Sequence, residues 1–365
     1  MSESKLKKLG KKIELAVRRA FISSLQSRSR PSVSRHSEAL QIPQDPTILF
    51  LRQDKLGDAI ISTPLLVAMY QKFPEAHFIM LLGEKNKGIA DLLPIPCEVI
   101  IYKKKLFSDL LMLRNLRNRK IDVLIDLMDN PSSTSSILIA AISARYSAGI
   151  EKENASAYNV LVPLLDRAQY HITRRLLELA RPFGIDPEGI PLRAVLKDIP
   201  AKKIDGRVGL VISAGVIDRQ LLPEVNSEIA SEIIAKEYAS QVMVFCDPKD
   251  RDPLGQMIVS KANNTRIVLA PVSNTFPDYA AILKTCEFVI TPDTSAVHLC
   301  SAYHIPVVVM TNPFPPTLHY WTPIDVPYEL IHEVGVRSLD SKTVVKHFEK
   351  LLEKVKPTLL EATTI

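Results

Sequence analysis

Residues 288–299 read FVITPDTSAVHL, and this stretch decides how the whole chain is interpreted. An apolar strand runs into a short polar turn, and a helix that opens with Asp293 and Thr294 follows at once. A strand that ends at a helix start presents unpaired backbone N–H groups and a positive dipole end at the edge of a sheet. The segment therefore predicts a phosphate site in an α/β fold.

A second segment far upstream has the same layout. Residues 48–52 (ILFLR) predict a strand, the turn QDKLGD follows at residues 53–58, and a helix comes next. Two strand–turn–helix sites in two halves of one chain predict a two-lobed enzyme that reacts in the cleft between its lobes.

The chain alternates short apolar strands with helices around both segments. In the first half we expect strands at residues 48–52, 77–82, 98–102 and 121–126, and helices at 58–73, 85–93, 106–119, 132–144 and 168–183. In the second half we expect strands at residues 208–213, 242–246, 266–269, 287–290 and 306–310, and helices at 223–238, 253–262, 277–286, 294–303 and 341–355. This alternation predicts α/β lobes with mostly parallel, doubly wound sheets.

The expected domain limits follow from this alternation and from changes in composition. They are a basic arm (1–45), an N-terminal Rossmann-like domain (46–197), a polar linker with one proline (198–203), a C-terminal Rossmann-like domain (204–340), and a helix with a tail (341–365).

The composition is that of a globular protein of two domains. The chain has 365 residues, of which 46% are hydrophobic and 24% are charged. The sequence contains no run of about 18 uncharged apolar residues, so we do not expect a helix that spans a membrane. The four cysteines form no CxxC pair, so we expect neither a disulfide framework nor a zinc site, and a reducing cytoplasm fits best.

The positive charge lies mainly in the N-terminal arm. Residues 1–35 hold ten Lys or Arg and two Glu, a net +8, and since the chain totals +6 the remainder carries −2. A nearly neutral body argues against nucleic acid as a partner. Residues 4–25 have the period of a basic amphipathic helix. That helix could bind an anionic membrane surface, dock on the protein itself, or be a mitochondrial transit peptide.

Both turns contain candidate site residues, and each can be interpreted either as a functional group or as a helix cap. Gly57 permits a tight backbone, and Asp58 at the mouth of a helix could be a general base or a simple N-cap. Asp293, Thr294 and Ser295 crowd one helix start, which exceeds the needs of one cap, and diphosphate oxygens on these N–H groups would explain the excess.

Several familiar signatures are absent, and one cluster stays ambiguous. The chain has no GxGxxG, no complete P-loop, no HExxH and no GxSxG. We therefore expect neither a nicotinamide or flavin cofactor nor a catalytic metal. Lys103, Lys104 and Lys105, with Arg114, Arg117, Arg119 and Lys120, could receive an anionic acceptor or form a solvated helix face.

Taken together, residues 48–66 with 73–76 and residues 278–313 resemble glycosyltransferase family 9, the heptosyltransferases of lipopolysaccharide core assembly. The resemblance covers about residues 46–352 in order and spacing. It implies a GT-B architecture of two Rossmann-like lobes and an interdomain cleft, in which residues 46–197 form the acceptor domain and residues 204–340 form the nucleotide-sugar domain. It also implies inverting, metal-independent transfer of a heptose-like sugar from a nucleotide-diphosphate donor.

The resemblance also assigns residues to roles. Asp58 would be the catalytic base, and Asp293 would contact the donor sugar. Thr294, Ser295 and Ala296 would offer N–H groups to the diphosphate, His298 would support that loop, and Arg52, Lys55 and Gly57 would contact the acceptor. The sequence departs from the family at Ser295, where glycine is usual, and at Gln220, which aligns with a lysine that reaches the diphosphate. The neighbouring Arg219 could supply that charge.

The resemblance implies an ADP-sugar donor, an anionic glycan or glycolipid acceptor, and a cytoplasmic enzyme, peripheral at the inner membrane. A catalytically reduced nucleotide-sugar-binding protein of the same fold is the alternative, motivated by Gln220 and Ser295. A further alternative is a sugar epimerase of the same fold, which would need no acceptor.

Overall fold

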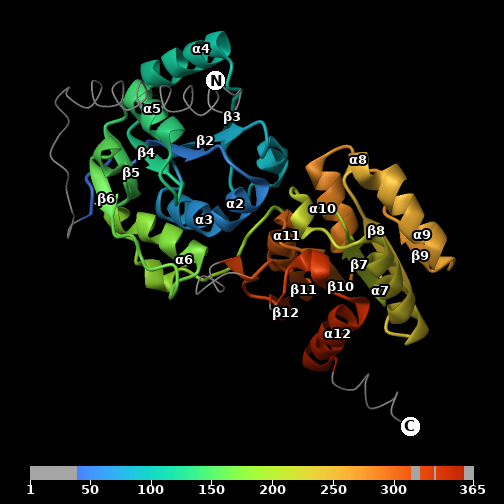
Figure 1. The fold of residues 1–365 in the computed structure, drawn as a ribbon. Coiled ribbons are helices and arrows are strands. Elements are labelled where there is room, and N and C mark those ends of the chain that lie inside the picture. The colour runs from blue at the N-terminus through green and yellow to red at the C-terminus, as the bar shows by residue number, and fades with distance from the viewer. Residues whose placement is uncertain (1–38, 314–320, 333, 357–365) are drawn as a thin grey trace, which may run out of the picture.

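The computed structural model describes residues 39–313, 321–332 and 334–356, and it confirms the predicted two-lobed α/β fold. Figure 1 shows one lobe built from the first half of the chain and the other from the second half. The predicted amphipathic arm helix at residues 4–25 lies outside the described residues. In the described part of the chain, no helix is long and apolar enough to cross a membrane.

The N-terminal lobe contains a six-stranded parallel sheet in the order β3-β2-β1-β4-β5-β6. Its strands are β1 (Thr47–Arg52), β2 (His77–Gly83), β3 (Glu98–Tyr102), β4 (Val123–Asp126), β5 (Tyr146–Ile150) and β6 (Val160–Val162). Its α-helices are α2 (Leu56–Ile61), α3 (Thr63–Lys72), α4 (Leu106–Asn118), α5 (Ser133–Ile142) and α6 (Ile172–Leu177). The 3₁₀ helices are η1 (Lys87–Leu92), η2 (Ala155–Ala157), η3 (Glu178–Phe183) and η4 (Pro187–Gly189).

The C-terminal lobe repeats this plan with the sheet order β12-β11-β10-β7-β8-β9. Its strands are β7 (Arg207–Val211), β8 (Gln241–Phe245), β9 (Ile267–Leu269), β10 (Phe288–Pro292), β11 (Val307–Met310) and β12 (Tyr328–Ile331). Its α-helices are α7 (Pro223–Ala235), α8 (Pro248–Asp250), α9 (Gln256–Ala262), α10 (Phe276–Lys284), α11 (Ser295–Tyr303) and α12 (Ser341–Val355). The lobe also contains the 3₁₀ helices η5 (Ile217–Arg219) and η8 (Val336–Ser338) and the π-helix η6 (Arg251–Gly255).

Successive side chains of the buried strands point to opposite faces of each sheet, and helices cover both faces. In β1, Ile48 and Phe50 face the core beneath α2 and α3, whereas Leu49 and Leu51 face the core beneath α4 and α5. All four side chains are fully buried. A strand that is apolar on both faces belongs in the middle of a doubly wound parallel sheet, which is where β1 lies.

The structure corrects the expected helix over residues 58–73. Ser62 ends α2 and starts α3, and Pro64 occupies the first turn of α3. Proline has no N–H to continue the helical ladder, and the Thr63 hydroxyl instead donates to the Ile60 carbonyl at 2.7 Å. The strands β5, β6 and β12 were not predicted, because each has five residues or fewer and the apolar pattern of β5 and β12 is interrupted by Ser, Gly or Glu.

The two lobes touch at two glycines of the N-terminal lobe. A Cβ atom at Gly57 in α2 would lie 2.6 Å from the His298 ring of α11. A Cβ atom at Gly88 in η1 would lie 2.8 Å from the Phe276 Cβ of α10. Such distances are below any real carbon–carbon contact, so each position requires glycine for the lobes to sit as they do.

We expect Gly88→Ala to lower the free energy of unfolding by about 1–3 kcal/mol, because overpacking here displaces the backbone-anchored Phe276 Cβ. Urea unfolding would measure this loss. Gly189→Ala is the matched control, since nothing lies within 4 Å of the added methyl group. Equal stability of the two variants would show that the lobe contact at Gly88 is not tight.

Candidate active site

A cavity of about 1100 Å³ lies between the lobes. The N-terminal lobe contributes Lys55, Leu56, Gly57, Asp58, Lys85, Asn130 and Arg167 to its wall. The C-terminal lobe contributes the larger share, including Ser213, Arg219, Asp247, Tyr279, Asp293, Thr294, Ser295 and His298. The carboxyl ends of β1, β7, β8 and β10 all open into this space, as expected for a ligand site in parallel α/β sheets.

Asp58 lies in the first turn of α2 but does not cap that helix. The N-cap position belongs to Lys55, and its side chain makes no capping bond. The simple capping interpretation of Asp58 is therefore wrong, and its carboxylate remains at the cavity wall. Burial raises the pKa of Asp58 to about 6, although Arg52 opposes this rise and Asp54 adds to it. A carboxylate with this pKa is charged at neutral pH and is a stronger base than an ordinary aspartate.

Arg52 is buried behind Asp58 and does not line the cavity. Its Nε donates to the Asp58 carbonyl at 2.9 Å, and its Nη1 donates to the Leu127 carbonyl at 2.5 Å. Its Nη2 lies 3.7 Å from Asp58 Oδ1. Arg52 thus connects the end of β1, the start of α2 and the end of β4.

A chain of polar contacts continues beneath this turn. Gln53 Nε2 donates to Ser135 Oγ at 2.9 Å, and Ser135 Oγ donates to Asp126 Oδ1 at 3.2 Å. Asp126 Oδ2 accepts from the Tyr158 hydroxyl at 2.5 Å and lies 3.4 Å from Lys152 Nζ. These side chains are buried, so their contacts fix the loops after β1 and β4 rather than meeting a ligand.

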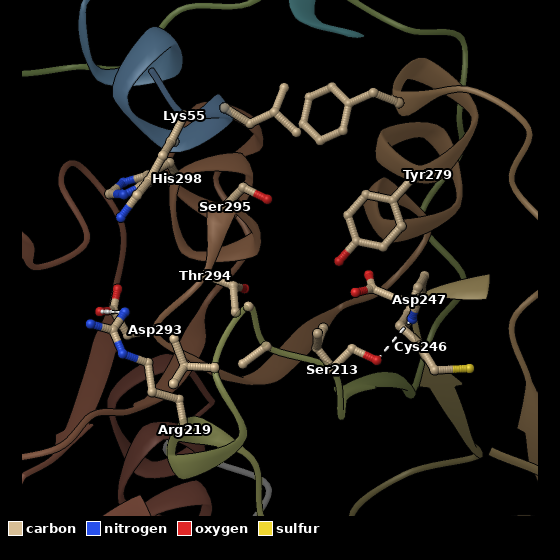
Figure 2. A pocket seen from close by; sticks show the side chains of 18 of the residues that line it. Lys55, Ser213, Arg219, Cys246, Asp247, Tyr279, Asp293, Thr294, Ser295 and His298 are labelled. Atoms are coloured by element: carbon tan, nitrogen blue, oxygen red, sulfur yellow. Dashed lines mark hydrogen bonds and ion pairs between the residues drawn. The ribbon is translucent and has the colours of Figure 1, made fainter. Parts of the chain in front are cut away.

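Asp293 follows β10 on the opposite wall of the cavity. Its Oδ2 lies 2.9 Å from Arg219 Nη1, and Figure 2 shows the two side chains together, with Lys55 and His298 nearby. Burial raises the pKa of Asp293, whereas Arg219 and Lys55 lower it. Since Lys55 also lowers the pKa of Asp58, this lysine lies within electrostatic reach of carboxylates on both lobes.

The start of α11 lines the same cavity as Asp58 and Asp293. Thr294 is the N-cap and accepts from the Ala296 N–H at 3.3 Å, so the Ala296 amide already has a partner. Ser295 is the first helical residue and lines the cavity, whereas Ala296 does not. The positive end of the helix dipole therefore opens at Ser295, where a negative group would be stabilised.

His298 lies one turn into α11 and is buried against Gly57. Burial lowers its pKa to about 4, so the ring is neutral at physiological pH. Its ring centroid lies 6.0 Å from that of Trp321. The supporting role expected of His298 stays a prediction.

Only one of the two neighbouring residues predicted to bind the sugar donor, Arg219 and Gln220, reaches the cavity. Arg219 lines the cavity, but Gln220 does not. The Gln220 amide donates to the Ala214 carbonyl at 2.9 Å and thereby closes the loop between β7 and η5. Of the predicted site residues, the cavity wall brings together Lys55, Gly57, Asp58, Arg219, Asp293, Thr294, Ser295 and His298, but not Arg52, Gln220 or Ala296.

Sequence reasoning missed the part of the cavity wall that contains Asp247 and Tyr279. Asp247 follows β8 and donates its N–H to Ser213 Oγ at 2.8 Å. Tyr279 packs edge-on to Phe245, with ring centroids 5.7 Å apart. Figure 2 shows Asp247 and Tyr279 across the cavity from Asp293. A polar residue close behind a buried strand was the available signal, because Asp247 lies two residues after β8 and Asp293 lies one residue after β10.

Comparison with known proteins identifies the class of protein to which this fold and cavity belong. Residues 110–330, more than half of the chain, match glycosyltransferase family 9 (heptosyltransferase). The chain therefore belongs to glycosyltransferase family 9. No curated protein sequence matches it.

Solved structures support the same fold. A family 9 glycosyltransferase from Veillonella parvula superposes with a TM-score of 0.71 at 18% identity, covering 86% of this chain and 99% of that one. ADP-heptose lipopolysaccharide heptosyltransferase II of E. coli gives 0.69 at 17% identity, covering 85% and 99%. E. coli heptosyltransferase WaaC with ADP gives 0.69 at 16% identity, covering 84% and 99%.

We expect Arg52→Met to raise the pKa of Asp58 above about 6, because Arg52 lowers that pKa in the native protein. The acid limb of the pH profile of kcat/KM for sugar transfer would then move to higher pH. Arg52→Lys is the matched variant, since it keeps the charge but loses the fork of donors, and its acid limb should move less. Identical acid limbs in all three proteins would contradict this electrostatic role.

Proposed function

We propose that this protein is an inverting glycosyltransferase that moves a heptose-like sugar from a nucleotide-diphosphate donor to a hydroxyl of an anionic glycan or glycolipid, such as a lipopolysaccharide core. The observation that carries the proposal is that one cavity holds the Asp58 carboxylate of one lobe and the start of α11 of the other. A base for the acceptor and a seat for the leaving group thus face the same space. An ADP-sugar is the favoured donor, since two of the similar E. coli structures contain ADP or an ADP-heptose analogue.

In the proposed reaction, Asp58 takes the proton from the acceptor hydroxyl as its oxygen attacks the anomeric carbon. The bond from that carbon to the diphosphate breaks as the new glycosidic bond forms, so the configuration inverts. Lys55 would meet the anionic acceptor, and the backbone of Gly57, whose missing side chain leaves room for the His298 ring, would lie beside that acceptor. These roles rest on their place at the same wall as Asp58.

The departing diphosphate carries the charge that the protein has to stabilise. In this proposal the N–H group of Ser295 at the start of α11 and the guanidinium of Arg219 would stabilise it. Arg219 is paired with Asp293, and this pairing holds its cation at the cavity wall. When the donor enters, Asp293 would accept from a sugar hydroxyl while Arg219 turns to the phosphate.

The far end of the cavity is the proposed seat of the nucleoside. Phe245 and Tyr279 offer aromatic surface for a base, and the Asp247 carboxylate lies beside them. Burial and the neighbouring Asp250 raise the pKa of Asp247. A carboxylate there can accept from ribose hydroxyls.

We expect Asp58→Asn to lower kcat by about 10²–10⁴-fold, the usual loss when a positioned base is removed. Nucleoside-diphosphate affinity should stay the same, because the donor site lies on the other lobe. In the native enzyme kcat/KM should fall as the pH drops through about 6, since protonation of Asp58 removes the base. Full turnover by Asp58→Asn would refute the assigned mechanism.

We expect Arg219→Met to weaken binding of a nucleoside diphosphate by about tenfold to a hundredfold, as loss of a charged hydrogen bond implies. Calorimetry with ADP, GDP, UDP, dTDP and CDP, each with and without magnesium, would measure the affinities and identify the base. Arg266→Met is the matched control, because Arg266 pairs with Glu237 at the surface of the same lobe. Equal affinity of both variants would exclude Arg219 from the diphosphate site.

A catalytically reduced nucleotide-sugar-binding protein is the second candidate. The observation in its favour is that Gln220 closes a loop, while Arg219 is already paired with Asp293. Clear nucleotide binding without hydrolysis or transfer would support this candidate. If the missing lysine is the limiting feature, Gln220→Lys should raise turnover from a low level.

A further inference from the structure

Helix α4 carries an apolar patch on its solvent side, which we define as Leu106, Phe107, Leu110 and Leu111. These side chains are 71%, 82%, 55% and 69% exposed. They occupy the first two turns of the helix and lie within six consecutive residues. Single exposed apolar residues are ordinary, but four large ones together on a monomer mark an interaction surface.

The opposite side of α4 is also apolar and packs on the core, so the exposed patch is not the face that the lobe needs for its own packing. Leu116 is fully buried, and Met112 and Leu113 pack with it on the core beneath α4 and α5. A helix that is apolar on two sides requires two apolar surroundings. The N-terminal lobe supplies one of them, and the α4 patch still lacks the other among the described residues.

Positive charge surrounds the α4 patch along the helix axis. Lys103, Lys104 and Lys105 precede it and are exposed, and Arg114 and Arg117 follow it on exposed positions. Between residues 103 and 120 the chain has seven Lys or Arg and one acidic residue, Asp109. An apolar centre with a cationic rim matches the acyl boundary and anionic headgroups of a bilayer.

The same charges argue against two other occupants. The N-terminal arm carries a net +8 and would be repelled by the cationic rim, although its amphipathic pattern offers an apolar face. A second copy of α4 would bring an identical cationic rim against the first. Anionic lipid satisfies both the apolar centre and the rim.

The position of α4 relates the patch to the cleft. Strand register places Arg52 beside Leu82 and Gly83 beside Tyr102, so β1, β2 and β3 end along one edge of the sheet. Asp58 follows β1, Lys85 follows β2, and the α4 patch follows β3. Lys85 lines the cavity, and Lys103 and Lys105 are near enough to its neighbour Glu84 to help Lys87 lower the pKa of that carboxyl. Figure 1 shows α4 at the outer rim of the N-terminal lobe.

We propose that the α4 patch and its lysines dock the N-terminal lobe on an anionic membrane surface, with the acceptor side of the cleft next to the bilayer. Phe107, Leu110 and Leu111 insert between headgroups, while Lys103 and Lys105 bind lipid phosphates. This inference deepens the proposed function, because a glycolipid acceptor would be held in that bilayer. Its test measures lipid binding and needs no turnover.

The experiment is flotation of the full-length protein with vesicles of phosphatidylcholine, alone or mixed with phosphatidylglycerol. The triple variant Phe107→Gln/Leu110→Gln/Leu111→Gln should lower partitioning onto the mixed vesicles by at least about tenfold. The double variant Lys103→Gln/Lys105→Gln should lower it by about tenfold on mixed vesicles only, and added salt should remove that difference.

A matched control replaces three exposed apolar residues elsewhere, as Leu164→Gln/Ile204→Gln/Met257→Gln. Its partitioning should stay within about twofold of the native protein. An unchanged melting temperature for each variant would show that its fold is intact. The inference is overturned if the folded α4 triple variant partitions onto vesicles like the native protein. That result would mean either that the N-terminal arm accounts for all lipid binding or that the α4 patch serves self-association instead. A failed transferase assay with intact lipid binding would count against the proposed function alone.

Discussion

The buried guanidinium of Arg52 is the interaction on which the rest of the site depends. It stands at the end of β1 and binds the carbonyls of Asp58 and Leu127, so it fixes where α2 begins. Burying a cation costs several kcal/mol unless it is compensated. Here Nε and Nη1 donate to the two carbonyls, and the carboxylates of Asp54 and Asp58 lie 3.5 and 3.7 Å away, although Nη2 makes no hydrogen bond within the described residues. The turn that carries Gly57 and Asp58 therefore has little freedom. The same cation counteracts the burial that raises the pKa of Asp58, so position and basicity are set together.

This turn also determines how the lobes meet. Gly57 lies against the His298 ring, and His298 belongs to the helix whose first residue, Ser295, faces the cavity. The residue next to the proposed base thus touches the helix that would receive the leaving group. A shift of one lobe would move both groups relative to the substrate. The second contact, between Gly88 and Phe276, lies farther along the interface and limits such a shift.

The fold was predictable because its signal is repeated. Buried strands such as ILFLR and FVITP are continuously apolar, and each ends at a polar turn, so the doubly wound plan could be read from the sequence. Short strands failed the same test, since β6 has three residues and β12 is only partly buried. Helix breaks depended on single residues, as at Ser62, where Pro64 and the Thr63 hydroxyl end one helix and start another.

Site residues could be predicted where they directly follow a strand. They could not be predicted where their role depends on which group the side chain contacts. Asp58, Asp293 and Ser295 reach the cavity because the sheet edge places them there. Arg52 and Gln220 have suitable chemistry, but their side chains turn to backbone carbonyls, which no spacing in the sequence indicates. Asp247 and Tyr279 were missed because their importance depends on two elements meeting at one end of the cavity. Exposure of the α4 patch was hidden for a related reason, since an apolar helix reads as core until its surroundings are known.

The most direct test of the central claim is a carboxyl carbon NMR titration of the aspartate-labelled protein, with the Asp58 signal assigned by its loss in Asp58→Asn. The account predicts a titration midpoint of about 6 for this carboxyl group. A midpoint near the ordinary aspartate value of about 3.9 would contradict it, because Asp58 would then be a solvated carboxylate with no enhanced basicity.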